Sequence, residues 1–193
     1  MPLPPPELPR EPLHTRSIRV NTYVREDGQW DLEAELIDFK AYDFPIMGGT
    51  ATRYAGDPIH HMLMRVTIND QFTITGAVAG YDAAPYGENC TAIAPDYQDM
   101  VGMNLLRNFR QVVKDRYGRT AGCSHMTELS YLLPTVAIQT MANQRRKERE
   151  AASVGDKTRR PFQLEGCHAL RLDGPVVQEI YPTWYAAPKA KHE

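Results

Sequence analysis

Two stretches of strict two-residue alternation constrain the fold of this chain most strongly. Residues 30–37 read WDLEAELI and residues 62–68 read MLMRVTI, so apolar side chains occupy one parity of each stretch. Successive side chains of a β-strand point to opposite faces, which makes this pattern typical of a strand with one buried face. We therefore expect both stretches to be half-buried strands of an antiparallel sheet.

Each alternating stretch has a neighbour with which it can form a hairpin. Upstream of the first, residues 18–24 have strand-type spacing, and the turn signal EDG occupies residues 26–28. Downstream of the second, the turn residues Asn69 and Asp70 precede residues 72–78, whose even-numbered members we expect on one face. The Gly-rich residues 45–58 between the two hairpins are expected to form a loop.

The apolar period then changes from two residues to that of a helix. Residues 96–117 predict one helix that is capped by Asp96 or Asp99 and stopped by Gly118. A second helix is expected over residues 125–150, with a kink at Pro134. Its inner face is formed by Met126, Leu129, Leu133, Val136, Ala137 and Thr140. Strands followed by helices predict an α+β fold, in which an antiparallel sheet of two hairpins packs against two helices in the C-terminal half.

Three segments are expected along the chain. Residues 1–14 form a Pro-rich arm, residues 15–150 a single α+β domain, and residues 151–193 an irregular segment that packs back on the domain. Tyr181, Trp184 and Tyr185 are the side chains expected to make that contact.

Composition narrows the class of protein. The 193 residues are 42% hydrophobic and carry a net charge of −2, which suits one domain with a core and lacks the basic footprint of a nucleic-acid binder. The chain contains no apolar run of about 18 residues, so we expect no membrane span. Its three cysteines are an odd number, and we expect them to be free thiols in a cytoplasmic protein. The expected partner is a small-molecule substrate, and the sequence leaves a homo-oligomer open.

Reactive side chains concentrate in residues 122–129, which read GCSHMTEL at the expected start of the second helix. The free N–H groups of a helix N-terminus stabilise a thiolate, here Cys123. His125 is close enough to act as a base or a second metal ligand, and Glu128 lies on nearly the same face. The alternative is a buried free cysteine beside a helix cap made by Ser124 or Thr127.

Three further places carry such side chains. Cys90 follows a strand, and alone it is typical of a small core residue. His60 and His61 begin a strand, so only one of them can face a given site. Cys167-His168 is interpreted as a surface or packing pair. We also expect a solvated acidic face on one strand, from which one carboxylate can reach a pocket; its residues are Asp31, Glu33, Glu35 and Asp38.

The stretches TRSIRVNTYVREDGQWDLEAELIDFK, GDPIHHMLMRVTIND, APYGENC and GCSHMTEL resemble a bacterial family known as domain of unknown function 2889. That family usually has His-Asp after Pro-Ile, whereas this chain has His60-His61. The resemblance implies an origin in bacteria that degrade aromatic compounds.

The order of the same motifs more distantly resembles the iron–sulfur cluster scaffold fold. That family has a Cys-Gly-Asp before a strand pair, a second cysteine after it, and His-Cys-Ser at a later helix start. The resemblance places His60 or His61 at the first ligand, Cys90 at the second and Cys123 at the third, with a histidine replacing the first cysteine. Two thiolates and one or two imidazoles suit zinc or iron.

Three hypotheses follow. The first is a lyase or hydrolase acting on a small aromatic or acyl compound, with Cys123, His125 and Glu128 as catalytic groups. A metal would be held by residues from His60, His61, Cys90, Cys123 and His125, or Cys123 would act without metal as a nucleophile with His125 as its base. The second is a metal or iron–sulfur carrier without catalysis. The third is that these side chains serve packing alone, in which case Cys90, Cys123 and His60 would lie far apart.

Overall fold

The computed structural model describes residues 2–152, 160–161 and 163–187. The chain divides into two compact units, Met1–Ala137 and Ile138–Glu193. The first unit holds both sheets, and the boundary falls within the long helix α3 (Ser124–Ala152).

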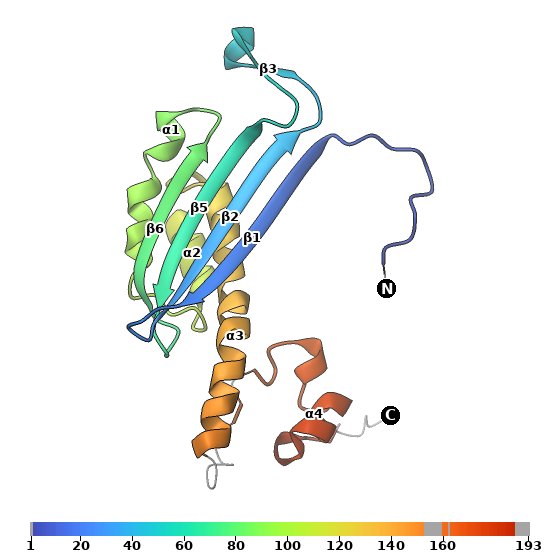
Figure 1. The fold of residues 1–193 in the computed structure, drawn as a ribbon, viewed down its shortest axis with the longest axis vertical. Helices are drawn as coiled ribbons and strands as arrows, with labels where there is room; N and C mark the ends of the chain where they lie inside the picture. Colours follow the sequence, from blue (N-terminus) through green and yellow to red (C-terminus); the bar gives the residue numbers. More distant parts are fainter. Residues whose placement is uncertain (1, 153–159, 162, 188–193) are drawn as a thin grey trace. The chain divides into compact units, whose positions relative to one another are not determined.

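A four-stranded antiparallel sheet in the order β1-β2-β5-β6 is the centre of the first unit (Figure 1). Its strands are β1 (His14–Val24), β2 (Trp30–Lys40), β5 (Pro58–Ile68) and β6 (Ile74–Ala83). The two expected hairpins are therefore confirmed, and they join through the β2–β5 pairing. The α+β fold class is likewise confirmed.

The expected loop over residues 45–58 contains a second, small sheet. β3 (Phe44–Ile46) and β4 (Ala51–Arg53) pair around a 3-10 turn at Met47–Gly49. Gly48 and Gly49 adopt φ values of 67° and 93°, a region that costs glycine little, and so they allow the tight reversal. The prediction of a structureless loop was wrong here because this reversal brings two short segments into pairing distance.

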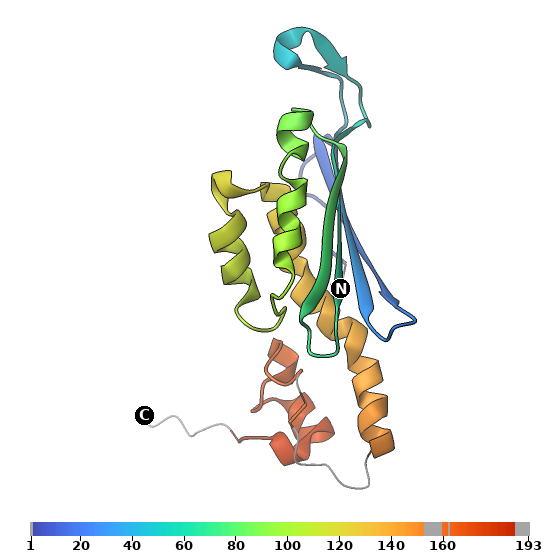
Figure 2. The ribbon, with the colours of Figure 1, turned by 90° about the vertical axis from the view of Figure 1, so that its left-hand side faces the viewer.

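The core lies on one face of the sheet. The even-numbered residues of β2 and β5 were expected to be buried, and this is confirmed. Four of them are fully inaccessible to solvent: Leu32, Leu36, Val66 and Ile68. Figure 2 shows the helical segments α1 and α2 on one side of the sheet. α3 packs against the same face, since the Ser130 hydroxyl of α3 contacts the sulfur of Met64 in β5 at 3.7 Å.

The expected face pattern fails near the start of β6. A register shift between Thr67 and Ile68 in β5 places Ile68 opposite Ile74 but Thr67 opposite Gly76. A bulge of this kind reverses which parity of the strand faces the core. Gly76 and Val78 therefore lie on the open face, and Val78 is 53% exposed.

The first expected helix is broken into shorter pieces. They are a 3-10 segment η2 (Ala94–Met100) and α2 (Phe109–Tyr117), and a further short helix α1 (Glu88–Thr91) lies upstream of the expected range. Between η2 and α2 the backbone pairs with β6 instead, because Gly102 N–H donates to Ile74 O at 2.8 Å. Asn108, in a left-handed conformation, precedes α2, so neither Asp96 nor Asp99 caps it. Gly118 ends α2 as predicted.

The second expected helix is confirmed as α3, which follows a 3-10 turn at Arg119–Ala121 and runs through Pro134 without interruption. Met126, Leu129, Leu133 and Ala137 are fully buried, as its inner face requires. In the part of the chain that the structure describes, no helix has the length and apolarity needed to cross a membrane.

Among the residues described after α3, the second unit contains only short helical pieces. They are η4 (His168–Leu170), α4 (Pro175–Ile180) and η5 (Pro182–Trp184). Leu164 and Val177 are buried within it, and Gln163 donates a hydrogen bond to the Tyr181 hydroxyl. The irregular character expected for this segment fits these short pieces, while its packing on the domain stays a prediction.

Candidate active site around Cys123 and Asp38

A buried carboxylate, Asp38, is the centre of the candidate site. Its side chain is 1% exposed on the helix-covered face near the end of β2. Arg16 of β1 binds it with two hydrogen bonds, from Nε at 2.8 Å and from Nη2 at 2.7 Å. His14 Nε2 lies 3.2 Å from Oδ1, and His60 Nδ1 lies 3.0 Å from Oδ2. We call Asp38, His14, Arg16, His60 and His125 the Asp38 cluster.

Strand register explains how these residues meet. Arg16 is the cross-strand partner of Asp38 on β1, and His60 is its partner on β5. Directly opposed residues on one face of a sheet have neighbouring side chains, so the three form a row across β1, β2 and β5. His14 lies two residues along β1 from Arg16, on the same face.

The charges of the cluster keep Asp38 ionised. Burial by itself raises the pKa of a carboxyl, but the Arg16 guanidinium, with smaller contributions from His60 and His125, outweighs it and lowers the pKa of Asp38. Burial lowers the pKa of His60, although the carboxylate opposes that shift. The site therefore holds a carboxylate anion next to an imidazole that tends to be neutral.

His125 joins the carboxylate to the thiol. Its Nε2 lies 3.5 Å from Asp38 Oδ2, and its Nδ1 lies 3.9 Å from Cys123 Sγ. The ring stacks on that of His60, with the centroids 3.9 Å apart and the planes tilted by 34°. Both ring nitrogens of His125 thus face a group that can exchange a proton with them.

The turn before α3 fixes Cys123. Its backbone N–H donates to the Tyr97 hydroxyl at 2.9 Å, and its carbonyl accepts from Thr127 N–H, also at 2.9 Å. Gly122 lies so close to Tyr117 that a Cβ there would be 2.5 Å from the Tyr117 carbonyl oxygen. The cysteine therefore cannot shift without moving the end of α2 or η2.

The Cys123 thiol has a lowered pKa of about 7. Burial by itself raises the pKa, but His125, the backbone N–H groups of Met126 and His125, and Tyr81 stabilise the thiolate and lower it. This agrees with the expectation that the start of a long helix favours a thiolate. The fold therefore favours the thiolate form of Cys123 over that of an ordinary cysteine.

Glu128 is connected to the cluster through Arg16, whose Nη1 forms an ion pair with the Glu128 carboxylate. The Glu128 side chain is 50% exposed. It therefore helps to position the guanidinium that holds Asp38. A catalytic role for Glu128 stays a prediction.

His61 points to the opposite face of the sheet from His60. Its Nε2 lies 2.9 Å from Glu35 and its Nδ1 3.5 Å from Asp82. Of the two adjacent histidines, only His60 thus faces the Asp38 cluster, in line with the alternation expected for a strand.

The other two cysteines lie outside the Asp38 cluster. Cys90 is half-buried in α1 and shares Tyr81 as a neighbour with Cys123. Cys167 is exposed and belongs to the second unit. Cys123 and His60 both contact the same imidazole, so these two do not lie far apart as the packing-only hypothesis required.

Asp38 lies on the helix-covered face of the sheet, not on the solvated acidic face expected from the sequence. It was grouped with Asp31, Glu33 and Glu35, which have odd numbers, whereas Asp38 continues the even, apolar parity of β2. The signal that could have identified Asp38 as a site residue was its position, a charged side chain in line with the apolar, buried residues of the strand. Arg16 had no comparable signal, because its partner comes from another strand.

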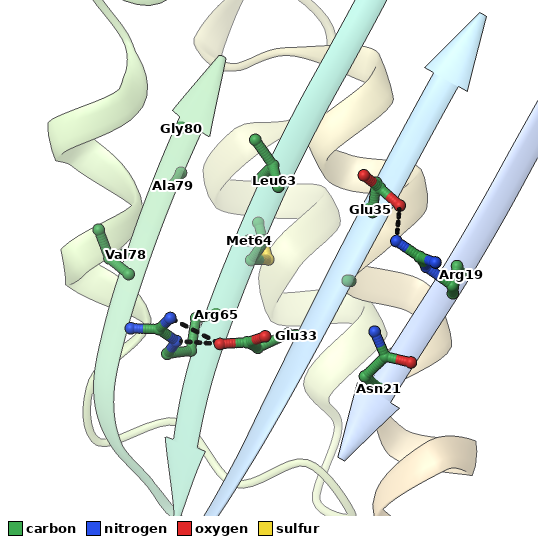
Figure 3. A pocket seen from close by; sticks show the side chains of 11 residues that line it. Arg19, Asn21, Glu33, Glu35, Leu63, Met64, Arg65, Val78, Ala79 and Gly80 are labelled. Carbon is green, nitrogen blue, oxygen red and sulfur yellow. Dashed lines mark hydrogen bonds and ion pairs between the residues drawn. The ribbon is translucent and has the colours of Figure 1, made fainter. Parts of the chain in front are cut away.

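The open face of the sheet carries a different set of residues. Figure 3 shows a hollow there, crossed by ion pairs between Arg19 and Glu35 and between Arg65 and Glu33. None of the residues lining this hollow is a cysteine or a histidine. It is therefore a surface distinct from the Asp38 cluster.

A metal ion could use part of the cluster. Asp38, His60 and His125 each offer one ligand atom, and these atoms all lie within 4.8 Å of one another. Carboxylate oxygens and imidazole nitrogens are ligands of zinc and iron. The group includes His60 and His125, two of the ligands considered from the sequence, together with Asp38, which was not among them.

The fold and the site define an α+β protein with a thiol, an imidazole and a carboxylate in one chain of contacts. The sequence matches the family described as Protein of unknown function (DUF2889) over residues 14–139, and the chain belongs to this family. The matched range contains the whole Asp38 cluster and Cys123. No curated protein and no solved structure shows a significant match. The resemblance to the iron–sulfur scaffold fold stays a prediction.

Proposed function

We propose that this protein is a hydrolase of small acyl compounds in which the Cys123 thiolate is the nucleophile. The observation that carries the proposal is the position of His125, whose Nδ1 faces Cys123 Sγ and whose Nε2 faces Asp38 Oδ2. A nucleophile within reach of a base that is itself oriented by a third group is the arrangement of nucleophilic catalysis.

Each residue then has a defined role. His125 takes the proton of the Cys123 thiol, and the thiolate attacks the substrate carbonyl carbon to form an S–C bond. His125 returns the proton to the leaving group as the old bond breaks. A water molecule, deprotonated by His125, then cleaves the thioester and releases the acid and the free thiol.

Asp38 and Arg16 support His125 in this scheme. In this scheme Asp38 accepts a hydrogen bond from the Nε2–H of neutral His125. The proton of the imidazole is thereby held at Nε2, and the lone pair of Nδ1 faces the thiol. Arg16 keeps Asp38 ionised and fixes its orientation through two hydrogen bonds. Neither Asp38 nor Arg16 needs to contact the substrate.

A second candidate is a metal-dependent enzyme, or a metal carrier, that uses Asp38, His60 and His125 as ligands. The closeness of their ligand atoms favours it. Two features favour the metal-free scheme instead. Arg16 already neutralises Asp38, and the two imidazoles stack with their centroids 3.9 Å apart, whereas the ligands of a tetrahedral ion diverge by about 109°.

The proposal is tested with a reactive aromatic ester, p-nitrophenyl acetate, on the full chain. We expect a burst of p-nitrophenol and an acetyl group on Cys123 by peptide mass spectrometry. Cys123→Ser should abolish the burst, and His125→Asn should reduce it at least about 100-fold, the lower end of the range for a general base. Cys90→Ser and Cys167→Ser are the matched controls and should react like the wild type.

Metal dependence separates the two candidates. The metal-free scheme expects full acylation after treatment with a chelator and no stoichiometric zinc or iron in the purified protein. A bound metal that is lost from His60→Ala and His125→Ala, together with activity restored by that metal, would favour the second candidate. Acylation spread over all three cysteines would refute Cys123 as a dedicated nucleophile.

A further inference from the structure

The hydroxyl of Tyr81 is buried without a hydrogen-bond partner among the residues that the structure describes. Buried polar groups are nearly always paired, so a buried donor without a partner calls for an explanation. The neighbouring Tyr97 differs in this respect. Its hydroxyl accepts a hydrogen bond from the backbone N–H of Cys123 and is thereby engaged in holding the turn.

Tyr81 lies in the interior beside the reactive thiol. It is the cross-strand partner of Met62, on the helix-covered face of β6. Its hydroxyl lies next to Cys123, close enough to favour the thiolate, and Tyr97 and Cys90 are its further neighbours. The hydroxyl therefore lies beside the sulfur to which a substrate would bond.

The Tyr81 hydroxyl keeps its proton at neutral pH. Burial, with the nearby Cys123 thiolate, raises the pKa of Tyr81 above its ordinary value. A phenol held in this way can donate a hydrogen bond to a developing negative charge without losing its proton. The site thus contains a hydrogen-bond donor that is shielded from water and lies close to the nucleophile.

We propose that the Tyr81 hydroxyl donates a hydrogen bond to the carbonyl oxygen of an acyl substrate while Cys123 attacks its carbonyl carbon. When the S–C bond forms, the π electron pair moves to oxygen, and this oxyanion accepts the Tyr81 hydrogen bond. When the oxyanion collapses, the leaving group departs with the proton from His125. This inference rests on the proposed function and narrows the substrate to esters or thioesters with an accessible carbonyl.

The test separates carbonyl chemistry from simple thiol reactivity. Tyr81→Phe removes the hydroxyl and keeps the ring, and Tyr86→Phe, at an exposed position, is the matched control. Two pH-independent rates are measured at Cys123, acylation by p-nitrophenyl acetate and alkylation by iodoacetamide, whose displacement step forms no oxyanion. We expect Tyr81→Phe to slow acylation about 100-fold, as for loss of one oxyanion donor, and to change alkylation less than threefold.

Each other outcome has one reading. Equal slowing of both rates would show that Tyr81 acts on the thiol or on the local structure, and the inference would be wrong. Unchanged acylation in Tyr81→Phe would overturn the inference but leave Cys123 as the nucleophile. Absence of acylation in the wild-type protein would instead remove the proposed function itself. A melting curve for each variant shows that the folded state is being compared.

Discussion

Asp38 shows how a single buried charge can organise a site. Arg16, His14, His60 and His125 all approach its two oxygens, and the carboxylate has almost no contact with water. A buried carboxylate is tolerated only when paired, and it then constrains every group that pairs with it. The position of His125, and through it the environment of Cys123, thus depends on one carboxylate.

Asp38→Asn should destabilise the first unit. The amide cannot neutralise Arg16, so the partly buried guanidinium keeps only its exposed ion pair with Glu128, at a cost of about 2 kcal/mol because Arg16 also retains some access to water. Urea unfolding measures the loss. Glu33→Gln, which breaks the exposed pair with Arg65, is the control and should cost less than about 1 kcal/mol. Equal losses in both variants would contradict the central role of Asp38.

The reactivity of Cys123 should follow a titration near neutral pH. Its folded-state pKa is about 7, below that of an unfolded cysteine at about 8.5. Alkylation of Cys123 should therefore reach half its maximum near pH 7 in the native protein and near pH 8.5 in urea. Iodoacetamide labelling followed by peptide mapping measures both midpoints. Coincident midpoints would show that the fold does not activate the thiol.

The same shift has a consequence for stability. A depressed folded-state pKa stabilises the native protein fully above the unfolded pKa, and the contribution disappears as the pH falls through the folded pKa. The free energy of unfolding contributed by Cys123 should therefore be lost between about pH 8.5 and pH 7. Comparing wild type with Cys123→Ser across this range isolates it.

Local signals predicted only part of the site. Cys123, His125 and His60 were found because reactive residue types cluster at a helix start and at a strand start. Arg16 and Tyr81 could not be found in this way. Arg16 pairs with Asp38, which lies 22 residues away in the chain. Tyr81 lies on β6, whereas its neighbour Cys123 directly precedes α3. Only the tertiary pairing of strands and α3 brings them together.

At the scale of elements, the register of the sheet and the start of α3 position the chemistry. β1, β2 and β5 place Arg16, Asp38 and His60 in one row, and Arg16 also reaches Glu128 on α3. β1 is exposed along nearly its whole length, so its pairing with β2 and these polar contacts hold it in place.

Gly122→Ala should disturb the start of α3. The added Cβ would come within 2.5 Å of the Tyr117 carbonyl oxygen and 2.8 Å of the Tyr117 Cβ, so the turn between α2 and α3 must move. We expect a loss of about 2 kcal/mol, typical of an overpacked site, and a higher alkylation midpoint for Cys123. Gly80→Ala is the control, because a Cβ there meets nothing within 4 Å. An unchanged midpoint in Gly122→Ala would show that the turn does not tune the thiol.

Strong periodicity predicted the hairpins and α3 correctly. The continuous first helix was wrong because helical spacing of apolar residues does not reveal that Gly102 donates its N–H to β6. The face of Val78 was wrong because a bulge, which inserts one unpaired residue, reverses parity without changing composition. Both errors arise from hydrogen bonds between segments that sequence periodicity does not record.

At the scale of the whole chain, the family match and the site both lie in the first part. Residues 14–139 match the family, and all strands and site residues belong to Met1–Ala137. We expect a chain truncated after Ala152 to fold and to retain the low alkylation midpoint of Cys123, because every contact described for the site is kept. Circular dichroism and iodoacetamide labelling check this. A truncated chain with an ordinary cysteine midpoint would show that the second unit is required.

The Arg16–Glu128 ion pair joins residues 112 positions apart in the chain. Contacts of this length close the largest loops and are entropically the most expensive to form during folding. The row from β1 to α3 can therefore be complete only once the whole sheet has docked on α3. Partly folded chains, during synthesis or after damage, would lack the paired carboxylate that orients His125, and the complete arrangement of thiol, imidazole and carboxylate would arise only in the finished molecule.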